Sequence, residues 1–167
     1  IWPIEEWKND LIEHTCTGRL LRRTPDGMVT TVVDRLCFAN GVALTAEMDA
    51  VLVAETGTRT IRRVALGADG SPRATMTWVE DLPGHPDNIS LGSDGLVWVT
   101  IASPTDPALR VLQRSPAAVR GLVRRAPERF KPTPKRTARV MALDSEGRMV
   151  HDLAFDATHW HLATGVR

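Results

Sequence analysis

The sequence predicts an all-β fold of the propeller type. Three stretches share one pattern, two alternating apolar–polar strands joined by a turn with a glycine, at residues 18–36, 60–82 and 138–155. Two others, 40–56 and 88–102, each open with asparagine and pair a short apolar strand with a longer one. The two kinds of hairpin alternate and recur after about 45 residues, which is the length of a four-stranded propeller blade.

The turns of the first kind of hairpin carry their own signal. Gly27, Gly70 and Gly147 each follow an acidic residue. Such pairs supply the positive φ that tight hairpin turns need. We therefore expect residues 1–167 to form a single propeller fragment, with about two complete blades and parts of two more.

Residues 103–137 interrupt the repeat. Their apolar residues are spaced as on helices, and six prolines divide the stretch, so we expect two short amphipathic helices inserted within one blade. The stretch is also rich in arginine: it holds Arg110, Arg114, Arg120, Arg124, Arg125, Arg129, Lys131, Lys135 and Arg136 against one acidic residue after Asp106. A solvated face is the favoured interpretation, and contact with a membrane surface is the alternative.

Composition limits which kinds of partner and cellular location remain possible. The chain has 167 residues, 43% of them hydrophobic, and a net charge of +1. No binding motif accompanies the basic residues, so we expect no nucleic-acid partner. No secretion signal or long apolar run is visible, which favours a cytoplasmic location, although the chain opens with Ile and any preceding segment lies outside the sequence.

Cys16 and Cys37 lie on different predicted strands and form no CxxC motif. A disulfide between them and two separate buried thiols both fit this spacing, and the sequence favours the thiols. We expect no zinc site from these two residues.

The stretches "FANGVAL" (residues 38–44) and "LPGHPDN" (82–88) resemble the strictosidine synthase-like branch of the six-bladed propellers. That branch is related to the SMP-30/gluconolactonase family and, more distantly, to the paraoxonases. The resemblance covers nearly the whole chain. A complete six-bladed propeller needs about 270–300 residues, so it implies that this chain is a central fragment whose partners include the remaining blades.

The resemblance also implies a metal site. It places Asn40, Asp87 and Asn88 in the central channel as ligands of a divalent cation. Amide and carboxylate oxygens suit Ca²⁺ or another hard cation. A capped turn or a polar channel wall with ordered water is the alternative. Ca²⁺ takes about 6–8 oxygens, so we expect weak or absent binding by this chain alone.

We therefore expect a fragment of a calcium-dependent hydrolase that acts on a small-molecule ester or lactone. One alternative is a strictosidine synthase-like condensing enzyme. The resemblance aligns its catalytic glutamate with Thr164, and the absence of Glu between Asp156 and Arg167 argues against that chemistry. The other alternative is a non-enzymatic propeller that binds a ligand or a membrane.

Other candidate residues have structural interpretations. No general base is identified: His85, His159 and His161 are weighed for that role, with rim or packing positions favoured. Glu55 ends a strand and is expected to accept hydrogen bonds. The aromatic residues Trp78 and Trp98 are expected to pack within blades.

Overall fold

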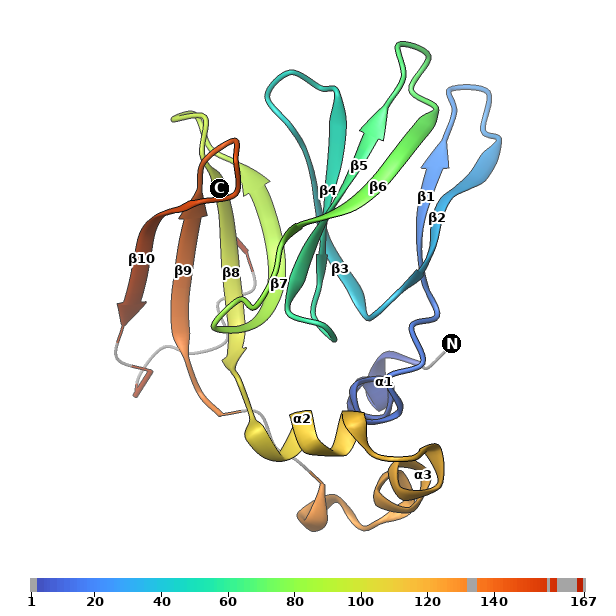
Figure 1. The fold of residues 1–167 in the computed structure, drawn as a ribbon, viewed down its shortest axis with the longest axis vertical. Helices are drawn as coiled ribbons and strands as arrows, with labels where there is room; N and C mark the ends of the chain where they lie inside the picture. Colours follow the sequence, from blue (N-terminus) through green and yellow to red (C-terminus); the bar gives the residue numbers. More distant parts are fainter. Residues whose placement is uncertain (1–2, 132–134, 156, 159–164, 167) are drawn as a thin grey trace.

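The computed structural model describes residues 3–131, 135–155, 157–158 and 165–166. Two four-stranded antiparallel sheets stand face to face, and a two-stranded hairpin lies beside the first of them (Figure 1). Each four-stranded sheet runs in chain order, so each is one complete blade of a propeller. The expected all-β propeller fragment is confirmed.

The strands follow the predicted hairpins closely. The lone hairpin is β1 (Gly18–Arg23) and β2 (Val29–Leu36). The first blade has β3 (Ala39–Leu44), β4 (Ala50–Glu55), β5 (Thr60–Leu66) and β6 (Pro72–Val79). The second blade has β7 (Gly84–Leu91), β8 (Val97–Pro104), β9 (Ala138–Leu143) and β10 (Met149–Phe155).

The core lies between the two blades. Fully buried side chains come from β4 and β5 on one side, such as Leu52 and Ile61, and from β8 and β9 on the other, such as Val99 and Leu143. Each contributes about 1.5–3 kcal/mol through burial. The outermost strand β10 is exposed along its whole length. Strands β4 and β8, by contrast, are buried along most of their length.

Helices gather at one end of the molecule, opposite the tips of the hairpins β1–β2, β3–β4 and β5–β6 (Figure 1). The insertion between β8 and β9 forms α2 (Pro107–Arg114), α3 (Ala117–Arg125) and the short 3₁₀ helix η2 (Glu128–Phe130), which confirms the two expected helices. The sequence analysis missed a third helix, α1 (Trp7–Glu13), which follows η1 (Ile4–Glu6).

Helix α1 packs against the insertion, and we call α1, α2, α3 and η2 together the helical cap. Polar contacts join its parts: Glu13 pairs with Arg124 at 2.7 Å, and the Gln113 side chain donates to the Leu11 carbonyl. The basic character of the insertion is thus partly matched by acidic α1. No helix in the described part of the chain is long and apolar enough to cross a membrane.

Candidate metal centre between two blades

The first strands of both blades carry the same irregularity near their beginnings. Residues 40–41 of β3 lie opposite the single residue Ala54 of β4. Residues 87–88 of β7 lie opposite the single residue Thr100 of β8. Where two residues of one strand lie opposite a single residue of its neighbour, the strand forms a β-bulge, which changes the direction of the side chains on it. The three predicted ligands all sit on these two bulges.

The two bulges touch each other. A Cβ atom built on Gly41 would lie 2.6 Å from the Cα of Asn88 and 2.7 Å from the carbonyl oxygen of Asp87. Only a residue without a side chain allows this approach. The contact brings Asn40 close to Asp87, and the Asn40 side chain lowers the pKa of the Asp87 carboxyl.

Thr56, which directly follows β4, connects the same two strands. Its hydroxyl receives a hydrogen bond from the Asn40 amide at 3.3 Å and donates one to the Pro86 carbonyl at 2.6 Å. Its own carbonyl accepts a hydrogen bond from Nδ1 of His85 at 2.8 Å. Thr56 therefore fixes the position of Asn40 relative to the beginning of β7.

Thr100 fixes the second bulge. The backbone N–H of Asn88 donates to its hydroxyl at 3.0 Å, and the hydroxyl donates back to the Asn88 carbonyl at 3.2 Å. Thr100 is fully buried. Neither threonine was identified from the sequence, because a threonine whose hydroxyl bonds to a bulge cannot be told there from any other threonine in a strand.

The carboxylate of Asp87 is half-buried. Burial raises the pKa of Asp87 above its ordinary value, and the hydrogen bond from Asn40 opposes that rise. Among the described residues, no lysine or arginine forms an ion pair with it. A bound cation would neutralise the charge of this carboxylate and offset the cost of its burial.

The donor set fits a hard cation. Asn40 and Asn88 offer amide oxygens, Asp87 offers a carboxylate, and both asparagines are exposed to solvent. The bulges lie inside the strands, since β3 begins at Ala39 and β7 at Gly84.

His85 is buried and lies beneath the helical cap, in a space of about 30 Å³ whose walls include Leu11 and Leu109. Burial lowers the pKa of His85, so the ring is neutral near pH 7. The bond to the Thr56 carbonyl assigns the ring proton to Nδ1. That space holds about one water molecule, which favours a positioning role for His85 over that of a general base.

The remaining candidates have packing roles or lie outside the described residues. Glu55 is buried and accepts hydrogen bonds from the Cys37 backbone at 2.6 Å and from the Thr60 hydroxyl at 3.2 Å, as expected. Trp78 packs against the core. Outside the described part of the chain lie His159, His161 and Thr164.

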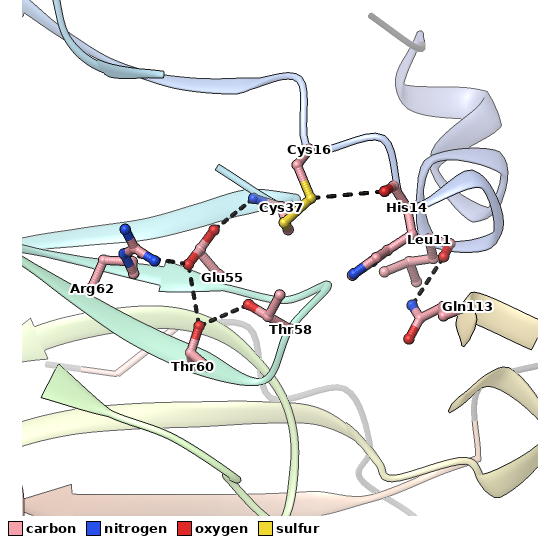
Figure 2. Close-up of a disulfide and its surroundings, with 9 residues drawn as sticks. All are labelled: Leu11, His14, Cys16, Cys37, Glu55, Thr58, Thr60, Arg62 and Gln113. Atoms are coloured by element: carbon pink, nitrogen blue, oxygen red, sulfur yellow. Dashed lines mark hydrogen bonds and ion pairs between the residues drawn. A yellow bond between two sulfur atoms is a disulfide. The ribbon is translucent and has the colours of Figure 1, made fainter. Parts of the chain in front are cut away.

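Cys16 and Cys37 form a disulfide, so the expectation of two separate thiols is wrong (Figure 2). The sequence alone could not show this pairing, because α1 and the turn after it carry Cys16 to the beginning of β3. The imidazole of His14 lies beside the two sulfur atoms (Figure 2). In this form the two cysteines are not metal ligands.

Comparison with known proteins identifies relatives of this chain. The family profile described as "SMP-30/Gluconolactonase/LRE-like region" matches residues 6–116. Protein strictosidine synthase-like 6 of Arabidopsis thaliana is 29% identical over 170 residues, which cover 99% of this chain and 44% of that protein. Adipocyte plasma membrane-associated protein of Salmo salar is 38% identical over 104 residues, or 61% of this chain and 24% of that protein.

Solved structures show the same fold. A regucalcin from Agrobacterium tumefaciens, described as a calcium-binding protein, matches with a TM-score of 0.56 at 14% identity. The match covers 84% of this chain and 37% of that chain. This chain therefore spans less than half the length of the relatives that it matches.

Proposed function

Because the chain belongs to the SMP-30/gluconolactonase/LRE-like family, we propose that it carries the metal-binding part of a calcium-dependent hydrolase of lactones or esters. The observation that carries the proposal is the contact between the two bulges. It brings an amide and a desolvated carboxylate from different blades close together. The name gluconolactonase in the family description supports the substrate class.

Each residue has a distinct part in the proposed site. Asp87 supplies the negative charge, and Asn40 and Asn88 supply neutral oxygens. Thr56 and Thr100 hold the bulges, so that the donors are arranged before the cation binds. A bound Ca²⁺ would supply a Lewis acid that polarises the carbonyl of the substrate. Further oxygens would come from water, from substrate and from blades outside this chain.

A calcium titration followed by calorimetry tests the proposal on the intact protein. We expect one bound Ca²⁺, with affinity reduced at least about a hundredfold by Asp87→Asn, a loss of about 2.7 kcal/mol. Asp94→Asn is the matched control, because Asp94 lies at the opposite end of the same hairpin and is exposed. Lactones and aryl esters are then assayed with both variants.

The outcomes separate the site from the reaction. Unchanged Ca²⁺ affinity in Asp87→Asn would show that the metal centre is wrongly assigned. Calcium binding without turnover of any lactone or ester would leave the site standing and refute the hydrolase. An assay for condensation of an amine with an aldehyde, run on the same protein, tests the synthase alternative and is expected to be negative.

The outer surface of the helical cap supports a second candidate function, docking on an anionic lipid surface. Val111, Leu122 and Phe130 are 69%, 72% and 65% exposed. Exposed arginines accompany them on the same helices: Arg110, Arg114, Arg125 and Arg129. Exposed apolar side chains among cationic ones are typical of helices that lie in a membrane interface.

Sedimentation with vesicles tests this second function. We expect the protein to bind vesicles that contain phosphatidylserine and not vesicles of phosphatidylcholine alone. The double variant Val111→Ser/Leu122→Ser should lose most of this binding. Met48→Ser is the control, because Met48 is 71% exposed on the β3–β4 turn, far from the cap. Equal loss in the control, or binding to both kinds of vesicle, would contradict the proposal.

A further inference from the structure

The residues around the disulfide form a cluster that has no part in the proposed hydrolase site. One ligand atom each from His14, Cys16 and Cys37 lies within 4.8 Å of the other two. It is the one group of three or more His, Cys, Asp or Glu side chains with this spacing in the described part of the chain. One nitrogen and two sulfurs are the donors that Zn²⁺ prefers.

The backbone arranges this cluster in an unusual way. His14, which directly follows α1, has φ of 52°, and Cys16 has φ of 51°. These two left-handed residues turn the chain back on itself, so that the imidazole of His14 and the sulfur of Cys16 both reach Cys37. Cys37 is held in turn by Glu55, which accepts its backbone N–H at 2.6 Å.

A fourth polar group lines the same narrow space. The half-buried Asp10 lies one helical turn before His14 and faces this space with His14, Cys16 and Cys37. Carboxylates beside a metal-binding histidine commonly fix the orientation of its ring, and they also serve as ligands. The space therefore brings three zinc-binding groups together, with Asp10 beside them.

From this arrangement we infer that the reduced form of the protein binds Zn²⁺ through His14, Cys16 and Cys37, with Asp10 orienting His14 or completing the site. A tetrahedral Zn²⁺ would hold its two sulfurs about 3.8 Å apart, so the two sulfurs, bonded to each other in the disulfide, must separate when zinc binds. Zinc and disulfide would thus be alternative links at one position, each joining α1 to the first blade.

The change between the two forms is a simple exchange. A dithiol reductant transfers two electrons and two protons to the Cys16–Cys37 bond, which leaves two cysteine thiols and the oxidised disulfide of the reductant. Zn²⁺ then replaces the two thiol protons, because thiolates are the metal-binding form.

Metal titration of the protein after reduction and removal of the reductant, without oxygen, tests the inference. We expect one Zn²⁺ bound by the reduced protein, measured by competition with a colorimetric chelator, and none at this site in the oxidised protein. Co²⁺ in place of Zn²⁺ should give the charge-transfer absorption of cobalt–thiolate bonds. Zinc should also raise the melting temperature of the reduced protein toward that of the disulfide form.

Variants identify the ligands. Cys16→Ser/Cys37→Ser should abolish the cobalt–thiolate absorption, and His14→Gln and Asp10→Asn should each weaken zinc binding at least tenfold. His151→Gln, on exposed β10, and Asp87→Asn, at the proposed calcium site, should leave it unchanged. Circular dichroism checks that each variant is folded. Failure of the reduced protein to bind zinc, or full binding by the double cysteine variant, would overturn the inference.

Discussion

Gly41 and Asn88 are in backbone contact across the two blades. A methyl group on Gly41 would lie 2.6 Å from the Cα of Asn88, a distance that ordinary packing does not allow. The clash would fall on backbone atoms, which have no alternative rotamer. The spacing of the proposed metal ligands therefore depends on a residue that itself offers no donor.

Substitution Gly41→Ala should therefore separate the two bulges. We expect it to lower the free energy of unfolding by about 1–3 kcal/mol, as overpacking does, and to weaken Ca²⁺ binding. Urea unfolding and calorimetry measure the two effects. Gly121→Ala is the control, because no atom lies within 4 Å of a Cβ at that helical position. It should be neutral or stabilise by up to about 1 kcal/mol.

Asp87→Asn should stabilise the metal-free protein while it removes Ca²⁺ binding. Burial raises the pKa of Asp87, so the folded state holds its proton more tightly than the unfolded state. Stability from this group is therefore lost as pH rises from the unfolded pKa, about 4, through the folded pKa. Thermal unfolding in chelator at neutral pH should show a higher melting temperature for the variant, and a lower one would contradict this account.

Acidification from pH 7 to pH 5 should destabilise the protein through His85. Burial and the charge of Arg59 lower its pKa, against the bond to Thr56 and the charge of Asp106. The folded state then binds fewer protons than the unfolded state, so stability is full above about pH 6.5 and falls below it. His85→Gln should flatten this slope in thermal unfolding.

Thr56→Val should cost about 1–3 kcal/mol of stability, because it leaves the buried Pro86 carbonyl without its donor. It should also weaken Ca²⁺ binding, since Asn40 loses its contact with the hydroxyl. Thr56→Ser keeps the hydroxyl and should restore both properties. Loss of Ca²⁺ affinity in the serine variant as well would show that the methyl group, rather than the hydrogen bonds, matters.

Removal of the disulfide should lower the free energy of unfolding by about 3 kcal/mol in zinc-free solution. The bond closes a loop between residues 21 positions apart in the sequence, and the loop entropy of the unfolded chain predicts this magnitude. Urea unfolding of Cys16→Ser/Cys37→Ser measures the loss. No change in stability would indicate that the cysteines are unpaired in solution.

The strands could be predicted well from the sequence, because each pattern that indicates them involves residues close together in the chain. Alternation along a strand and the acidic–glycine turns depend on neighbouring residues, and the four glycines at the hairpin tips, Gly27, Gly70, Gly95 and Gly147, all have positive φ. Helix α1 was missed because its seven residues are too few for a clear helical period.

The features of the site that could not be predicted depend on contacts between distant segments. The hydroxyl of Thr56 reaches Pro86, 30 residues away in the sequence. The pairing of Cys16 with Cys37 depends on the turn after α1. In both cases the residue type is ordinary, and only the packing of one blade on the next gives it a role.

The Cys16–Cys37 bond also encloses β1 and β2 in a covalent ring, with the exposed residues Pro25 and Asp26 at its tip. A protease that cuts the chain at this tip would not release either piece. The nicked molecule would migrate as one chain in denaturing electrophoresis without reductant and as two with it. Cleavage at the tip of this hairpin would thus leave both ends of the cut attached to the propeller.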